Sequence, residues 1–235
     1  RATDLGSSEV SVSFAFSVPI QTTDLAKPRS VARFRYLLLV QGRPPIRKRL
    51  HRRAGGIRFI TFSNYRRLPL LGKPGARSAF VDCLYESREK FDFALYAWVV
   101  MPEHVHILLF PRHNIPMAAI LKSMKLTASI RILKRWKELR APILSKIIGP
   151  AGRPLLWQPG GGFDRNVRDD AEFRREIRYC HQNPVKRGLV VKPEWWDWSS
   201  CRWWMGIREP SVRPCDPPPG EEREWAAWIE AKRYM

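Results

Sequence analysis

Residues 93–110 read FALYAWVVMPEHVHILLF, and this stretch decides the fold. Its two apolar runs, residues 93–100 and 106–110, have the length and the β-branched content of buried strands. The connection at residues 101–103 is so short that the two strands must pair antiparallel. The stretch therefore predicts a β-hairpin whose turn leads directly into His104.

The sequence outside this hairpin alternates between strands and helices. In chain order, the predicted elements are strand 57–62, helix 76–90, the two hairpin strands, helix 117–139, a strand within 155–167 that glycines break, and helix 169–183. Pro184 is expected to end the last helix, because proline lacks a backbone N–H. This order predicts an α+β fold, a ferredoxin-like (split βαβ) antiparallel sheet with an added C-terminal helix that carries Tyr179.

The composition is typical of a globular protein with an anionic partner. Of 235 residues, 44% are hydrophobic, which is enough for a core and excludes full disorder. The 42 Lys and Arg against 22 Asp and Glu give a net charge of +20, so nucleic acid is the expected partner, ahead of an acidic membrane surface. No apolar run approaches the roughly 20 residues of a membrane span. The 4 Cys lack metal-site or disulfide spacing, which favours a reducing, cytoplasmic location.

The chain divides into three predicted parts. Residues 1–56 lack a helical or strand period and end in a cluster of Arg and Lys. Residues 57–205 hold the predicted fold, and residues 206–235 form a proline-containing tail that is expected to be loosely attached. The basic arm is open to two interpretations: a solvated, disordered segment, or a tail that binds nucleic acid.

His104 and His106 are the most specific chemical feature of the sequence. Side chains two residues apart in a strand point to one face, so the two imidazoles are expected to project together. Such a pair can bind a divalent metal at neutral pH. His-x-His also occurs as an incidental surface pair, and these residues alone leave both interpretations open.

Tyr179 and Asn183 form a second candidate pair. They are four residues apart in a predicted helix and therefore share one face. A tyrosine hydroxyl beside a metal can attack a phosphodiester, and an amide oxygen can complete the metal site. The alternative is structural: Tyr179 packs in the core, and Asn183 caps the helix before Pro184.

Two blocks of the sequence resemble one family. The run YAWVVMPEHVHILL, residues 96–109, is similar to the MPNHVHLLL signature of the IS200-like, single-tyrosine (Y1) HUH transposases. The run RYCHQNPVKRGLV, residues 178–190, resembles the block RYIHxNPVKAGLV of their REP-associated branch. The tripeptides FDR at 163–165 and WSS at 198–200 also match that branch. The resemblance covers about residues 57–205.

This resemblance implies a metal-dependent single-stranded DNA endonuclease and strand transferase that acts on DNA hairpins. It implies that Tyr179 is the nucleophile and forms a 5′-phosphotyrosine. It implies that His104, His106 and Asn183 bind Mg²⁺ or Mn²⁺. It also implies a bacterial protein that works as a monomer with its complete site in one chain, a dimer being the alternative.

The sequence departs from the family pattern at two places near this site. Glu103 stands where Asn or Asp is commoner, directly before the histidine pair. Gly161-Gly162 stand where the family has aromatic or bulky residues before Phe163. Neither departure removes a catalytic group, and the glycines imply a different shape for the DNA groove.

Basic residues of the long helix and of the loop before the tyrosine helix are candidates for contacts with the DNA backbone. They are Lys122, Lys125, Arg131, Lys134, Arg135 and Arg168. An ordinary solvated helix face explains those of the long helix equally well.

Two rival functions remain. One is a degenerate transposase that only binds DNA hairpins. The other is an RNA-recognition-like module in which Phe59 and Phe62 stack on bases, although the glycine and aromatic pattern of such modules is absent.

Deleting residues 1–56 tests whether the basic arm binds nucleic acid. With fewer phosphates neutralised, fewer counterions are released, so affinity for single-stranded DNA should depend less steeply on salt. Fluorescence anisotropy at several salt concentrations measures the slope of log affinity against log salt. A slope equal to that of the full chain would contradict a DNA-binding arm.

Overall fold

The structure is a computed structural model that describes residues 56–113, 115–160 and 162–222. All of them belong to one compact unit, Arg43–Met235. The predicted basic arm lies outside the described residues except for Gly56, so its two interpretations and the predicted domain boundaries stay predictions. Within the described ranges, none of the helices combines the length and the apolar character that a membrane span requires.

An antiparallel sheet forms the centre of the fold. In the part of the chain that the structure describes, its strands are β1 Arg58–Ser63, β2 Phe93–Val100, β3 His104–Pro111 and β4 Phe163–Asn166. Their order is β2-β3-β1-β4, so the first and third strands are central. β2 and β3 form the hairpin that residues 93–110 predict. The α+β prediction is confirmed, and the strand order is that of the split βαβ plan.

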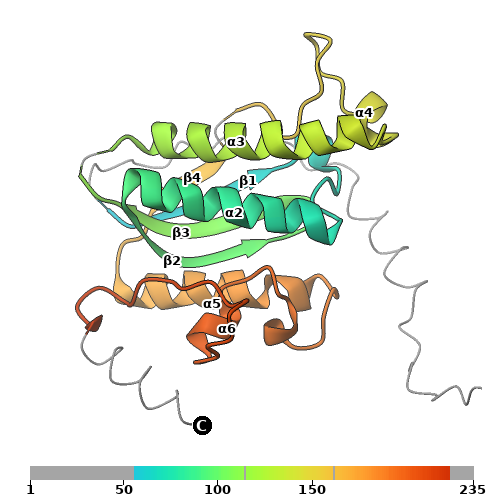
Figure 1. The fold of residues 1–235 in the computed structure, drawn as a ribbon. Helices are drawn as coiled ribbons and strands as arrows, with labels where there is room; N and C mark the ends of the chain where they lie inside the picture. Colours follow the sequence, from blue (N-terminus) through green and yellow to red (C-terminus); the bar gives the residue numbers. More distant parts are fainter. Residues whose placement is uncertain (1–55, 114, 161, 223–235) are drawn as a thin grey trace, which may run out of the picture. The chain divides into compact units, whose positions relative to one another are not determined.

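Long helices cover both faces of the sheet (Figure 1). α2 Pro74–Phe91 and α3 Met117–Glu138 lie on one face, and α5 Asp170–Lys186 lies on the other. Each face has its own apolar cluster, with Ile60 and Phe62 on the α2 and α3 side and Phe59 on the α5 side. The short helical segments are η1 Tyr65–Arg67, α4 Ile143–Lys146, η2 Pro193–Trp195 and α6 Cys201–Trp204.

β3 alternates its side chains between the two clusters. Val105 and Ile107 are fully buried on the α2 and α3 side, whereas Leu108 packs with the α5 cluster. By the two-residue period of a strand, His104 and His106 share the face of Leu108. The hairpin therefore delivers both imidazoles to the α5 side, at the point where β3 begins.

The fourth strand is shorter than the sequence predicts. It covers Phe163–Asn166 instead of most of 155–167, because Gly160 and Gly162 have φ values of 101° and 74° that interrupt an extended strand. A Cβ atom on Gly162 would lie 2.3 Å from the carbonyl oxygen of Thr61. Close approach of the chain to β1 therefore requires glycine at position 162, which explains why no bulky residue precedes Phe163.

α5 continues through Pro184 to Lys186, so the prediction that Pro184 ends this helix is wrong. The backbone N–H of Arg187 donates to the carbonyl of Asn183 at 3.0 Å, and that of Leu189 donates to the carbonyl of Pro184 at 2.9 Å. Proline removes only its own donor, and the turn after it closes normally. Asn183 therefore lies inside the helix and does not cap it.

The segment after α5 returns to the sheet along β2. The backbone N–H of Val100 donates to the carbonyl of Trp198 at 2.9 Å. Further along the chain, the carboxylate of Asp216 accepts a hydrogen bond from the backbone N–H of Leu95 at 2.7 Å. The described part of the C-terminal tail, which ends at residue 222, is thus attached to the edge of the sheet, whereas the sequence predicts a loose tail.

Gly162→Ala is expected to lower the free energy of unfolding by about 2 kcal/mol, because the methyl group meets the Thr61 carbonyl and the backbone is held at positive φ. Chemical denaturation measures this loss. Gly75→Ala is the matched control, since nothing lies within 4 Å of its Cβ position in α2. Equal stability of both variants would contradict the required close approach.

Candidate active site

His106 is the centre of a polar cluster on the α5 side of the sheet. Its side chain is 4% exposed, and its ring stacks on Phe59 with 5.6 Å between centroids and 13° between planes. Its Nδ1 lies 2.6 Å from Oγ1 of Thr61, which β1 places directly opposite. Burial, and then the nearby charge of His104, hold the pKa of His106 well below its ordinary value. The ring is therefore neutral at physiological pH, with one nitrogen lone pair available.

His104 faces His106 across a short gap. The two Nε2 atoms are 2.9 Å apart, and Nδ1 of His104 lies 3.3 Å from Oε1 of Glu103. When the Nδ1–H groups donate to Glu103 and Thr61, both Nε2 lone pairs point at the same place. Two ligands about 2.1 Å from one ion, at a right angle, are about 3 Å apart. The spacing therefore fits a shared metal ion.

Asn183 approaches the two imidazoles from α5. The residue is 6% exposed, and its amide nitrogen, Nδ2, lies 3.1 Å from Nε2 of His106. Rotating the amide by half a turn places Oδ1 at the same position, because the two orientations are equivalent in shape. The described residues hold no cluster of three or more His, Cys, Asp or Glu that fits a metal ion. An amide oxygen is thus the third ligand that this site offers.

Tyr179 lies one helical turn before Asn183, at the rim of the cluster. Its ring meets His106 edge-on at 5.1 Å and Phe59 at 5.9 Å, and the residue is 39% exposed. Burial raises the pKa of Tyr179, although its hydrogen bond with Asn183 acts in the opposite direction. The phenol is therefore protonated at neutral pH. It is also open to solvent, where an extended substrate can reach it.

Charged groups surround this cluster. The Nζ atom of Lys186 is 5.4 Å from the centroid of the Tyr179 ring. Arg187 donates to the carboxylate of Glu103, which also faces His104. Burial raises the pKa of Glu103, but the hydrogen bond with His104 and the charge of Arg187 outweigh it, so this pKa lies below its ordinary value. Glu103 is therefore an anion next to the histidine pair.

The predicted site residues thus come together from two distant stretches of one chain: His104 and His106 from β3, Tyr179 and Asn183 from α5. The sequence did not indicate that Thr61, Phe59 and Lys186 belong to this site. It also did not indicate that Arg187 pairs with Glu103. Thr61 and Phe59 join the site only through the register of β1 against β3, for which a single sequence has no signal. Lys186 is three residues after Asn183, so the helical period was a usable signal for it.

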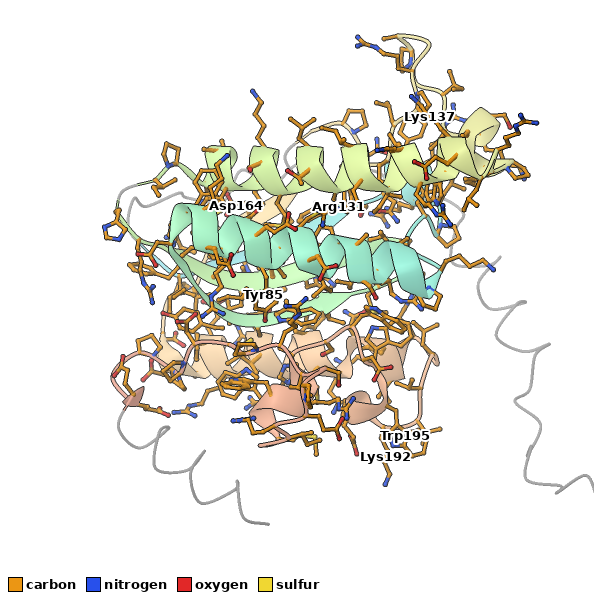
Figure 2. The ribbon with its side chains drawn as sticks, in the orientation of Figure 1. Tyr85, Arg131, Lys137, Asp164, Lys192 and Trp195 are labelled. Atoms are coloured by element: carbon orange, nitrogen blue, oxygen red, sulfur yellow. The ribbon has the colours of Figure 1, made fainter. Side chains whose placement is uncertain are left out.

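The α3 residues that are predicted to contact DNA lie away from the cluster around His106. α3 covers the opposite face of the sheet from α5, and Figure 2 shows Arg131 on α3, far from Lys192 and Trp195, which follow α5. Arg131 pairs with Glu86 and Arg135 with Glu138, and Nζ of Lys125 lies 5.3 Å above the ring of Phe62. Lys122 and Lys134 are exposed. Arg168, before α5, is exposed and donates to Glu172. The DNA-binding role of all six stays a prediction.

Comparison with known proteins finds similarity to one family of transposases. Residues 54–148 match the family model described as "Transposase IS200 like", a range that includes the histidine pair and ends before Tyr179. Over this range the chain is similar to the IS200-like transposases. A curated relative, the REP-associated tyrosine transposase of Escherichia coli K12, is 27% identical over 109 residues, which are 46% of this chain and 54% of the relative. The chain therefore matches about half the length of that relative.

One solved structure supports the fold. A structure described as a REP-associated tyrosine transposase bound to a REP hairpin matches with a TM-score of 0.52 and 22% identity, covering 72% of this chain and 91% of the other. A putative transposase from Deinococcus radiodurans R1 matches with a TM-score of 0.39 and 18% identity, which is too distant to support an argument. The first match supports the expected α+β fold of this chain.

Proposed function

We propose that this chain is a metal-dependent single-stranded DNA endonuclease and strand transferase that acts on DNA hairpins through a 5′-phosphotyrosine intermediate. One observation carries the proposal. The exposed Tyr179 ring lies edge-on to the buried His106, and His104 and Asn183 meet His106 at 2.9 Å and 3.1 Å. A nucleophile and three candidate metal ligands therefore surround one point.

The chemistry needs a phosphodiester at this point. The Tyr179 oxygen attacks phosphorus, a P–O bond forms to the tyrosine, and the bond to the 3′ oxygen breaks. The proton that the phenol loses is matched by one that the leaving oxygen gains, which gives a 3′-hydroxyl. A second 3′-hydroxyl reverses the step and joins strands without a nucleotide cofactor. His104, His106 and Asn183 would hold Mg²⁺ or Mn²⁺, which would supply charge neutralisation at the phosphate.

The surroundings of Tyr179 in this chain set how readily its phenol ionises. The pKa of Tyr179 is raised by burial, so the phenol resists ionisation. The ammonium group of Lys186, 5.4 Å from the ring, favours the phenolate that forms during attack. Asn183, one turn further along α5, also acts to lower the pKa of Tyr179.

The proposed partner is a DNA hairpin with single-stranded flanks. A relative of this fold is described as bound to a REP hairpin. The net charge of +20 favours any such polyanion.

The RNA-recognition alternative does not agree with the structure. Phe59 and Phe62 are 4% and 2% exposed and belong to the clusters of opposite faces. They form no common platform on which bases stack, because helices cover both faces of the sheet. A degenerate hairpin-binding protein remains as the alternative, and adduct formation decides it.

Tyr179→Phe is expected to abolish the covalent adduct and to leave hairpin affinity within a few-fold, because only the attacking oxygen is lost. A labelled hairpin with single-stranded flanks is incubated with the protein and Mn²⁺, and SDS-resistant adducts are counted on a gel. Tyr96→Phe, a buried tyrosine of β2, is the control and should keep the adduct. Undiminished adduct formation by Tyr179→Phe would refute the assignment, and hairpin binding without any wild-type adduct would favour the degenerate protein.

A mixture of Tyr179→Phe and His104→Ala chains should stay inactive, because the structure brings the tyrosine and both histidines together within one chain. Adduct formation by the mixture is compared with each variant alone, after circular dichroism shows that both are folded. Recovery of activity in the mixture would mean that subunits exchange the tyrosine helix.

A further inference from the structure

We propose that the Glu103–Arg187 ion pair is a positioning device. It keeps the proton of His104 on Nδ1, and it holds α5 at the distance from the histidines that the proposed metal site needs. Glu103 lies in the β2–β3 turn, and Arg187 is the C-cap residue that directly follows α5. The inference deepens the proposed function and rests on its metal site.

Glu103 acts on His104 from the side of the ring opposite the metal site. Its Oε1 lies 3.3 Å from Nδ1, whereas Nε2 of His104 faces His106. A carboxylate at this position accepts a hydrogen bond from Nδ1–H, which keeps the proton on Nδ1 and leaves the Nε2 lone pair free for a cation. Partners of this kind orient the imidazole and increase its basicity without touching the metal. Glu103 is therefore a positioning residue and not a ligand.

Arg187 connects the same carboxylate to the tyrosine helix. Its guanidinium donates to Oε1 of Glu103, and its backbone N–H donates to the carbonyl of Asn183 at 3.0 Å. Asn183 and Arg187 are one turn apart and share a helix face. Holding Arg187 against the turn therefore holds the Asn183 amide at a fixed distance from the histidines.

The pair is poorly built for stability alone. Glu103 is 7% exposed, and its second oxygen, Oε2, is buried without a hydrogen-bond partner among the described residues. The Arg187 side chain is 33% exposed, so solvent weakens its attraction for the buried carboxylate. A pair with one buried, partly unmet acceptor gives little net stabilisation, and apolar residues of similar size often replace buried charges without loss. Both residues also differ from the motifs quoted above, which have Asn and Ala at these positions.

The test removes both charges together, in the full-length chain. Glu103→Met with Arg187→Met should raise the Kd for Mn²⁺ about 10- to 100-fold, the usual effect of losing such a partner, while the thermal midpoint stays close to that of wild type. Calorimetry measures the Kd. Long-range ¹H–¹⁵N spectra of the imidazoles, recorded without metal, should show His104 protonated on Nδ1 in wild type and redistributed in the variant.

Two further variants make the result specific. Asp82→Asn with Arg213→Gln removes an exposed ion pair between α2 and the tail, and should leave the Mn²⁺ affinity unchanged. If the double Met variant does not fold, Glu103→Gln decides instead. Its affinity for Mn²⁺ should fall about fivefold, because a neutral acceptor is weaker than a charged one.

The outcomes separate the inference from the proposed function. Wild-type affinity and an unchanged His104 proton position in the folded variants would overturn the inference and leave the proposed function intact. Wild-type protein that binds no Mn²⁺ would overturn the metal site itself, and the inference with it.

Discussion

The pairing of β1 with β3 in a single register is the constraint on which the site depends. It places Thr61 opposite His106, so that the hydroxyl meets Nδ1 while Phe59 stacks on the ring. A shift by one residue would turn every β3 side chain to the other face and bury both imidazoles against α2 and α3. Ile60 and Phe62 oppose this shift, because the same register buries them in the apolar cluster on that side. The packing of the core and the geometry of the site thus require the same register of β1 against β3.

α5 combines an anchored face with a reactive edge. Phe173, Ile177 and Cys180 are buried at helical spacing and attach the helix to the sheet. Asn183 and Tyr179 lie at the border of this face, where the amide is 6% exposed and the tyrosine 39%. Within one helical turn the chain therefore shields a candidate metal ligand and opens a candidate nucleophile. A polymer substrate requires this arrangement, since it must reach the tyrosine without entering a closed pocket.

The sequence was sufficient for the elements and for the four central residues, and insufficient for what depends on long-range pairing. The His-x-His spacing predicts one shared face because a strand alternates strictly, and the i, i+4 spacing of Tyr179 and Asn183 predicts the other pair in the same way. Nothing local indicates that Thr61 faces His106 or that Arg187 reaches Glu103, which lies 84 positions away along the chain. The Pro184 prediction failed because the rest of the last turn compensates for one missing donor.

The direction of the tyrosine helix explains why the proposed reaction needs a cation. Helix N-termini are favourable sites for phosphates, because backbone N–H groups and the helix dipole attract anions there. Tyr179 and Asn183 instead lie in the last two turns of α5, near its negative end, and Glu103 adds a negative charge beside His104. Arg187 is paired with Glu103, and Nζ of Lys186 lies 5.4 Å from the centroid of the tyrosine ring. The +20 charge of the chain attracts DNA from a distance, but salt screens exposed charges beyond about 8–10 Å. A phosphodiester held at Tyr179 therefore requires positive charge at the phosphate itself, and the two imidazole lone pairs with the Asn183 amide mark where a divalent ion would provide it.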